Sequence, residues 1–322
     1  MEKTTKPAAR TGVIRTIIFI ALFTLLFHTV SETLEDKRYR DYMASLYAEP
    51  KNTVDVLILG SSHTLNGIDA VRLSEICGVN ANNFAQSGQV LPQTYYALQE
   101  ALRTQTPKLV VLDAYKTVQD SLIDSPATMH HTADNMKPGL PKARMVYDLL
   151  PRGERSEYLF DVIAYHTRWK ELTYADFAPP DVSAKGGQVL HGGYQPYEGW
   201  EVLNEDVTAP PAAVEIEYLD RIVALCREKR IEVLLVSVPF TTPEDDDLNR
   251  QAVLNGMADY ASENGLPYLN LMHRTDEIGF DFWTDMADMY HVNERGMAKV
   301  TDYLGTYLTE HYDFSVAPGK QS

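Results

Sequence analysis

Val54-Asp-Val-Leu-Ile-Leu-Gly-Ser-Ser-His63 is the stretch from which the fold can be worked out. An apolar, β-branched run ends abruptly in Gly60-Ser61-Ser62, and a helical pattern follows over about 65–77, which predicts a strand, a tight turn and a helix. A serine then lies at the carboxyl end of a strand, where open parallel sheets bind ligands and where turn amides favour negative charge. The serine is a candidate nucleophile, but a structural or phosphate-cradling turn fits this stretch equally well.

Strands and helices alternate on both sides of this stretch. Because 322 residues give room for one large α/β domain, we expect a three-layer, doubly wound, flavodoxin-like parallel sheet with helices on both faces. The expected strands cover 54–59, 82–85, 109–112, 232–238 and 268–271, and the expected helices cover 65–77, 92–103, 214–229, 248–264 and 294–308.

The alternation fails between about 115 and 211. This segment is rich in aromatic residues, histidine, proline and glycine, and it includes Trp200. Long excursions at the carboxyl edge of a sheet commonly line or cover a site. We therefore expect a long insertion that contributes to substrate binding.

The amino-terminal segment predicts a membrane anchor. No charged residue occurs from Thr16 to Ser31, and adding 11–14, with Arg15 snorkelling, gives a length that can span a bilayer. Basic residues before this run place the amino terminus in the cytoplasm, and the lack of a cleavage site favours an uncleaved signal anchor over a removed signal peptide. The expected organisation is a tail and anchor over 1–31, a helical stalk over 32–50, an exported domain over 51–312 and a tail over 313–322.

The composition of the chain limits the partners and cofactors that the protein is expected to bind. A net charge of −16 argues against nucleic acid, since phosphate binding needs a basic face. Cys77 and Cys226 fall in expected helices and are interpreted as small buried hydrophobes rather than as a disulfide. No metal or cofactor is predicted, because the spacing of the remaining candidate ligands resembles no zinc signature. Those candidates are His130, His131, Asp134 and His191.

A second chemical motif, Asp288-x-x-His291, stands just before the last expected helix. A carboxylate at this spacing can reach back to Nδ1 of the imidazole and leave Nε2 free as a base, although a helix-capping loop explains the same residues. Asp285 competes for the same role, and spacing favours Asp288. Loops after the first and last strands can converge at one sheet edge.

A third element is Asn83-Phe-Ala-Gln-Ser-Gly-Gln89. Gly88 offers a backbone amide that can approach a ligand closely, and an ordinary glycine turn is the alternative. Ser62 is preferred over Ser61 as the nucleophile. His63 is interpreted as a supporting residue or a local cap rather than the base, because adjacent side chains usually diverge.

Together these motifs resemble the SGNH (GDSL-like) hydrolase family. In that resemblance Gly60-Ser61-Ser62 takes the place of Gly-Asp-Ser, which makes Ser62 the nucleophile, Gly88 an oxyanion donor, and Asp288 and His291 the rest of the triad. The amino-terminal anchor resembles extracytoplasmic members, including those similar to DltD and the O-acylation proteins of cell-surface polymers. The family's third block, Gly-x-Asn-Asp, has no asparagine in 112–116.

The resemblance implies an extracytoplasmic serine esterase or O-acyltransferase that acts on acyl, mainly acetyl, esters of a cell-envelope glycan or glycopolymer. Its partners would be that polymer, the membrane through the amino-terminal helix, and a membrane-bound acyl-transfer protein. Loss of one oxyanion donor costs about 10²- to 10³-fold in turnover. Tyr115 or the insertion is a candidate replacement, and the alternative function is a non-catalytic, membrane-anchored polymer-binding or assembly component.

Overall fold

The protein is built on one five-stranded sheet. The computed structural model describes residues 6–37, 39–180, 185–193, 207–241 and 249–315. All neighbouring strands are parallel, in the order β2-β1-β3-β4-β5, which is the flavodoxin-like order. The strands are β1 (Val56–Leu59), β2 (Ala81–Asn83), β3 (Leu109–Asp113), β4 (Glu232–Ser237) and β5 (Tyr268–Asn270). The predicted doubly wound α/β fold is confirmed.

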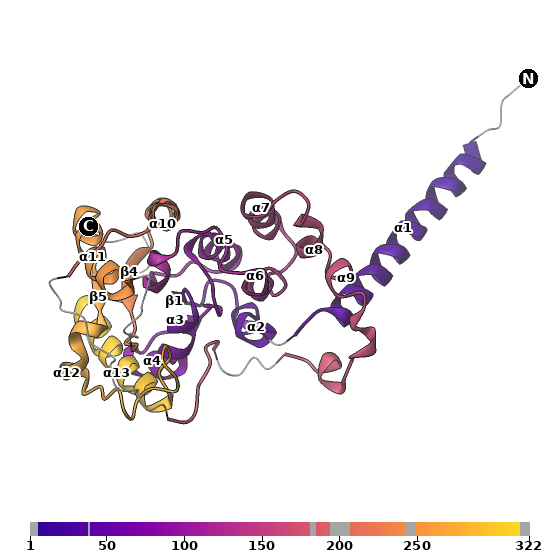
Figure 1. Ribbon diagram of the computed structural model, residues 1–322. Helices are drawn as coiled ribbons and strands as arrows, with labels where there is room; N and C mark the ends of the chain where they lie inside the picture. Colours follow the sequence, from indigo (N-terminus) through magenta and orange to yellow (C-terminus); the bar gives the residue numbers. More distant parts are fainter. Residues whose placement is uncertain (1–5, 38, 181–184, 194–206, 242–248, 316–322) are drawn as a thin grey trace, which may run out of the picture.

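Helices cover both faces of the sheet, as Figure 1 shows. Alternate residues of β1 point to opposite faces, so Leu57 and Leu59 join one apolar cluster while Val56 and Ile58 join the other. This double burial explains why the strand is a continuous apolar run. The first face is covered mainly by α2 (Arg40–Ala48), α5 (Leu91–Ala101) and α10 (Ala213–Lys229), the second mainly by α4 (Ala70–Cys77) and α13 (Glu294–His311), and α11 (Arg250–Glu263) contributes to both.

The helix expected over 65–77 is two helices in the structure. The first, α3 (Ser62–Gly67), begins earlier because the Ser61 side chain accepts a hydrogen bond from the His63 amide. The second, α4, begins after Asp69, whose side chain accepts from the first amides of that helix. The cap at Asp69 interrupts an apolar pattern that reads as one helix.

The amino-terminal helix α1 (Lys6–Leu34) projects away from the rest of the chain in Figure 1. Its part Thr11–Leu34 is long and apolar enough to cross a membrane, a property that a signal sequence shares. The expected stalk over 32–50 differs from the structure, because α2 buries Met43 and Leu46 completely in the core.

The expected insertion is helical where the structure describes it, up to residue 180. Its helix α7 packs on α5, and α9 packs on α1. Its elements are η1 (Tyr115–Val118), α6 (Pro126–Ala133), α7 (Leu140–Leu149), α8 (Arg155–Leu159), α9 (Asp161–Tyr165), η2 (Arg168–Lys170) and η3 (Tyr174–Phe177). The short elements η4 (Leu271–Arg274) and α12 (Thr275–Ile278) follow β5. Trp200 and the ends of the chain, 1–5 and 316–322, lie outside the described residues.

A later part of the insertion returns to the sheet beside β2. The amide of Asn83 donates to the carbonyl of Lys185, at 2.9 Å. Gly186 has a φ of +73°, and a Cβ atom there would lie 1.8 Å from the Asn83 carbonyl oxygen. Only glycine fits this close approach of two backbones.

Candidate active site

Ser62 is the first residue of α3, and the turn before it is held from the neighbouring strand. Gly60 has a φ of +143°, and a Cβ atom there would lie 2.2 Å from Cβ of Asp113, so the turn requires glycine. Asp113, at the end of β3, accepts hydrogen bonds from the amide and the hydroxyl of Ser61. Ser61 is fully buried, and its hydroxyl is used in the bond to Asp113. Of the two serines, Ser62 is therefore the one that is partly accessible.

The structure brings Ser62, His291 and Asp288 into one chain of hydrogen bonds. Nε2 of His291 lies 2.8 Å from Oγ of Ser62, although 229 residues separate them in the sequence. Nδ1 of the same ring lies 2.9 Å from each carboxylate oxygen of Asp288. A carboxylate at Nδ1 holds the proton there and leaves Nε2 to accept one from the serine.

Asp288 is fixed by its own loop. Its carboxylate also accepts from the amides of Tyr290 and His291, at 2.8 and 2.9 Å. Burial acts to raise the pKa of Asp288, but the hydrogen bonds from the His291 ring and from these amides hold that pKa below its ordinary value. The carboxylate is therefore ionised when it faces the imidazole.

Asp285, the competing carboxylate, has a structural place instead. It is fully buried, with its carboxylate 2.6 Å from Nζ of Lys299 and 3.7 Å from Nε of Arg295, both on α13. It also accepts from the amide of Asp281. Asn293 caps the same helix by accepting from the amides of its first turn. The loop before α13 thus contains one carboxylate that ties down the helix and another that contacts the histidine.

His63 lies behind the site and is buried. Its ring stacks on Tyr115 with the ring centres 3.3 Å apart, and lies 5.5 Å from the ring of His291. Burial, followed by the charges of His291, Lys116 and Arg250, lowers the pKa of His63 well below its ordinary value. The His63 ring is neutral and lies next to the ring of His291, and it is Nε2 of His291 that accepts the hydrogen bond from Ser62.

The two expected oxyanion residues occupy different settings. Gly88 has a φ of +69°, and a Cβ atom there would lie 2.2 Å from Cγ2 of Thr128 on α6, so both conformation and space require glycine. Tyr115 is nearly buried through its stacking on His63. The roles of Gly88 and Tyr115 toward an oxyanion stay predictions.

Asp113 is the residue that sequence reasoning missed. Besides holding Ser61, its carboxylate accepts from the amide of Tyr115, at 2.9 Å. Burial raises its pKa, and its hydrogen bonds with Ser61 and Tyr115 act in the opposite direction. The signal in the sequence is an acid that ends an apolar strand. Because Leu112 pairs with Leu59, the next residue of β3 must lie beside Gly60.

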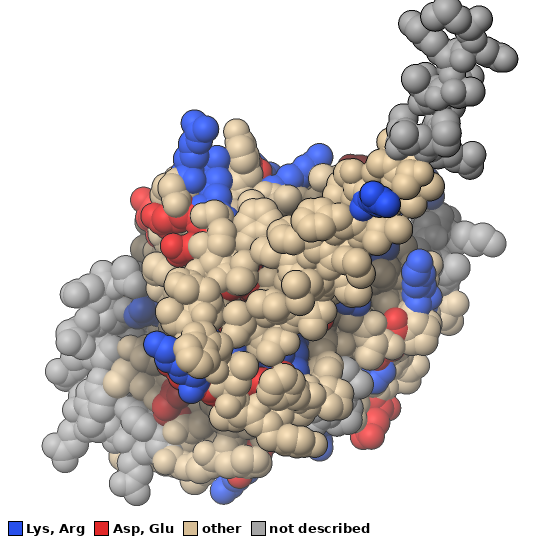
Figure 2. Space-filling model, turned by 90° about the vertical axis from the view of Figure 1, so that its right-hand side faces the viewer, with Lys and Arg blue, Asp and Glu red and all other residues tan. Residues whose placement is uncertain are grey.

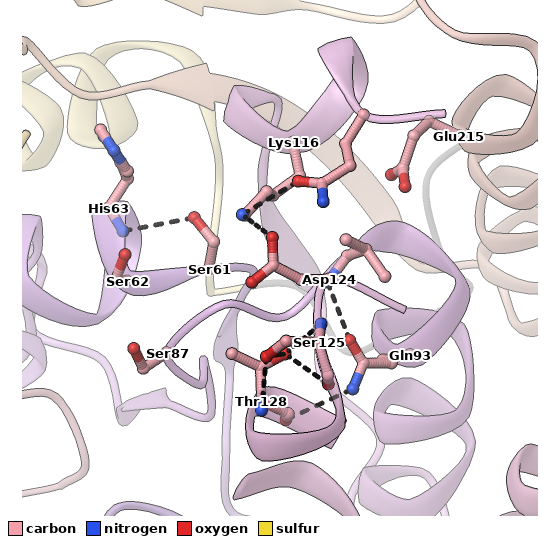
Figure 3. A network of polar contacts seen from close by, with 12 residues as sticks. Ser61, Ser62, His63, Ser87, Gln93, Lys116, Asp124, Ser125, Thr128 and Glu215 are labelled. Atoms are coloured by element: carbon pink, nitrogen blue, oxygen red, sulfur yellow. Dashed lines mark hydrogen bonds and ion pairs between the residues drawn. The ribbon is translucent and has the colours of Figure 1, made fainter. Parts of the chain in front are cut away.

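A polar cluster lies on the other side of the turn, and Figure 3 shows it with Ser61 between it and His63. Nζ of Lys116 lies 2.9 Å from Asp124 and 3.2 Å from the side-chain oxygen of Gln119. Glu215 is fully buried and accepts from the Leu91 amide, and burial raises its pKa to about 8. Lys116 of this cluster is close enough for its charge to help lower the pKa of His63.

Among the described residues, no group of three or more histidine, cysteine, aspartate or glutamate side chains is arranged to hold a metal ion. His130 lies 3.0 Å from Asp134, the ring centres of His131 and Tyr39 are 3.7 Å apart, and His191 lies 3.4 Å from Glu294. Cys77 and Cys226 are free thiols.

Comparisons with known proteins give likenesses in structure. No family model matches the chain, and no curated protein matches it. A protein proposed to be an acylhydrolase, from Bacteroides fragilis, shares 13% identity at a TM-score of 0.45, over 86% of this chain and 99% of that one. A GDSL-like lipase from Bacteroides thetaiotaomicron shares 13% identity at a TM-score of 0.42, over 85% and 98%. An acetyl xylan esterase from Butyrivibrio proteoclasticus shares 8% identity at a TM-score of 0.34, over 81% and 65%. At these values the likenesses carry no information on this protein's substrate.

Proposed function

We propose that the protein is a serine esterase or O-acyltransferase of the SGNH type, with Ser62, His291 and Asp288 as its catalytic triad. The observation that carries this proposal is the continuous series of hydrogen bonds from Oγ of Ser62 through the His291 imidazole to the Asp288 carboxylate. Each link has the distance and the order that nucleophilic catalysis needs. A cleft that only binds a polymer has no chemical need for this arrangement.

In the proposed reaction, Oγ of Ser62 attacks the carbonyl carbon of an ester while its proton moves to Nε2 of His291. Asp288 stabilises the imidazolium, and the amides of Ser62 and Gly88 stabilise the oxyanion. When the tetrahedral intermediate collapses, the alcohol leaves and takes the proton from His291. Water or a sugar hydroxyl then attacks the acyl-serine by the same proton transfers in reverse.

The proposed mechanism lacks an identified third donor to the oxyanion. The residue that follows Leu112 is Asp113, whose oxygens already accept from Ser61 and Tyr115. Its oxygens are occupied as acceptors, so it is a poor donor to an oxyanion. Without a replacement, turnover falls by about 10²- to 10³-fold. A phenolic hydroxyl from Tyr115 is one candidate replacement.

The proposed substrate is an acyl ester of a cell-envelope glycan or glycopolymer, and acetyl is the favoured acyl group. This part of the proposal is supported by the apolar helix α1, which is long enough to cross a membrane, and by the basic residues before its apolar run, which favour an amino terminus in the cytoplasm. In that place a membrane-bound acyl-transfer protein is the natural donor partner for the transferase version. Esterase and transferase differ in the acceptor, so adding acceptor sugars and measuring acylated sugar against free acid separates them.

A second candidate function is a membrane-anchored polymer-binding component without catalysis. The absence of an asparagine after β3 favours it, since an enzyme of this type gains from a third donor. The hydrogen bond between Ser62 and His291 argues against a function without catalysis.

The test is covalent labelling of the full-length protein with a fluorophosphonate probe, with the labelled peptide mapped by mass spectrometry. We expect labelling at Ser62 that is lost in Ser62→Ala and in His291→Ala. Ser262→Ala, which alters an exposed serine of α11, is the matched control and keeps the label. A folded protein without label at Ser62 would favour the binding component.

A further inference from the structure

A row of phenylalanines runs along α1 and continues onto the body of the protein. The ring centres of Phe19 and Phe23 are 6.2 Å apart, and those of Phe23 and Phe27 are 6.1 Å apart. Residues spaced by four share one face of a helix. The ring of Phe27 then meets the edge of Phe160, just before α9, with the centres 6.2 Å apart. The insertion therefore packs directly on the aromatic face of α1.

The position of Phe27 sets the depth of this contact. At 1.5 Å per residue, Phe27 lies about 10 Å before the end of α1 at Leu34. The candidate span Thr11–Leu34 has 24 residues, whereas a hydrocarbon core of roughly 30 Å needs about 20. In a membrane, Phe27 would lie about 4–10 Å inside the outer boundary of the hydrocarbon, and the part of the insertion that contacts it would lie at a similar depth.

The side chains around this contact are apolar and exposed. No residue of α9 is buried, and Ile163 is 44% exposed. The next elements expose Trp169 by 64%, Tyr174 by 89% and Phe177 by 65%. Aromatic rings of this kind are enriched at the headgroup level of bilayers.

Two of the three acids of the same segment, Asp161 and Asp176, face basic partners, and the third, Glu171, is exposed. The Asp176 side chain is 5% exposed and pairs with Arg168, while Asp161 faces Lys142 at 3.8 Å. Figure 2, which faces the side that carries α1, shows a broad uncharged area across its centre, with charged residues mostly around it. The exposed Lys170 stands next to Glu171 and offsets its charge near an anionic membrane surface.

The segment is also fixed to the end of α1. The Arg168 guanidinium donates to the carbonyls of Leu34 and Glu35, at 3.0 and 2.6 Å. These are carbonyls at the carboxyl end of a helix, which lack partners within the helix. The contacts hold the exposed face at a set position along α1, as seen at the foot of α1 in Figure 1.

We infer that residues 159–177 form a membrane-seating surface, which lies in the headgroup region of a lipid bilayer around the outer end of α1. The inference rests on the insertion of α1 in a membrane, which is part of the proposed function, but not on catalysis. Amphipathic segments of this kind bury their apolar face about 5–10 Å into the headgroup and acyl boundary. The seating surface would orient the catalytic domain on the membrane.

Spin labelling of the full-length protein in phosphatidylcholine–phosphatidylglycerol vesicles tests this inference. Nitroxides are attached at Ile163→Cys and Phe177→Cys in a Cys77→Ala background, which keeps the buried Cys226. Val71→Cys on α4 is the matched control, because Val71 is 39% exposed and lies on the far side of the sheet from α5. Phe19→Cys reports on the insertion of α1 itself. Collisions with lipid-dissolved oxygen are compared with collisions with a water-soluble nickel chelate.

We expect the ratio of oxygen to nickel collisions to be several-fold higher at Ile163 and Phe177 than at Val71. A high ratio at Phe19 with a low ratio at Ile163 overturns the seating surface while the anchor stands. Low ratios at both positions overturn the insertion of α1 and the inference with it. Protection of Ile163 from both reagents assigns the surface to a protein partner and also overturns the inference. Fluorophosphonate labelling of Ser62 on the same samples reports separately on the proposed function.

Discussion

Replacing Asp288 with asparagine removes a charge from the site while the shape of the loop is kept. The side-chain oxygen of asparagine can still accept from the amides that Asp288 holds at 2.8 and 2.9 Å. Its amino group is a donor, so opposite Nδ1 of His291 it favours the tautomer with the proton on Nε2. In that tautomer Nε2 cannot accept the proton of Ser62.

The magnitude follows from the contacts. In a serine protease the equivalent change lowers kcat by about 10⁴-fold. The Asp288 side chain is 52% exposed, so solvent screens its charge and the loss should be somewhat smaller. We expect a fall of about 10³- to 10⁴-fold, which corresponds to about 4–5.5 kcal/mol of transition-state stabilisation. Stability should change by no more than about 0.5 kcal/mol, because the side chain is half exposed and keeps its amide contacts.

The assay is the rate of fluorophosphonate labelling at Ser62, followed by hydrolysis of a simple acetyl ester, with thermal unfolding measured on the same samples. Asp285→Asn is the matched control. It breaks the 2.6 Å pair with Lys299, so it should cost about 1–3 kcal/mol of stability and leave the labelling rate of the folded fraction little changed. Wild-type labelling in Asp288→Asn, or a larger loss of rate in Asp285→Asn, would refute the assignment.

Three further changes test the supports of the site. Gly60→Ala should prevent soluble expression or lower the Tm strongly, because its Cβ would lie 2.2 Å from Cβ of Asp113 at a φ of +143°. Ser61→Ala should cost about 1–3 kcal/mol in denaturant unfolding through loss of a buried bond to Asp113, while the probe still labels Ser62. Burial raises the pKa of Glu215 from 4.5 to about 8. Between these pH values the folded state keeps a proton that the unfolded state loses. The free energy of unfolding should therefore fall by up to about 1.4 kcal/mol for each unit by which the pH rises in this interval. Glu215→Gln should flatten the dependence of Tm on pH in that interval, and an unchanged slope would contradict the shift.

The strands could be predicted from the sequence because both of their faces are buried. β1, β3 and β4 are apolar runs ended by turn residues, and their observed bounds differ from the predicted ones by up to two residues. The break between α3 and α4 was missed for a physical reason. Leu65, Ile68 and Leu73 are all fully buried, so the apolar pattern continues through a cap that only Asp69 marks.

The insertion was assigned to substrate binding because of its place in the chain, and this stays a prediction; the structure shows that its helices α7 and α9 pack on α5 and α1. Apolar spacing tells which face of a helix is buried and leaves open which neighbour buries it. The stalk over 32–50 was misplaced similarly. The many charged residues of this segment made it look exposed, and the burial of Met43 and Leu46, which attach α2 to the core, was not predicted.

Residue types and their spacing are enough to predict only part of the site. The spacing of Asp288 and His291 predicted their bond, because three residues of loop allow a carboxylate to turn back on an imidazole. The contact of His291 with Ser62 depends on the order of the strands, which places the loops after β1 and β5 at one edge. Asp113 could not be predicted from a motif, since its role arises from the register of β3 against β1. The resemblance expects a donating asparagine in the region 112–116, and the polar residue at the end of β3 in that region is Asp113, which accepts from Ser61. The turn that positions Ser62 is therefore stabilised by a group unsuited to help the oxyanion, and the proposed mechanism would rely on backbone amides or on another donor.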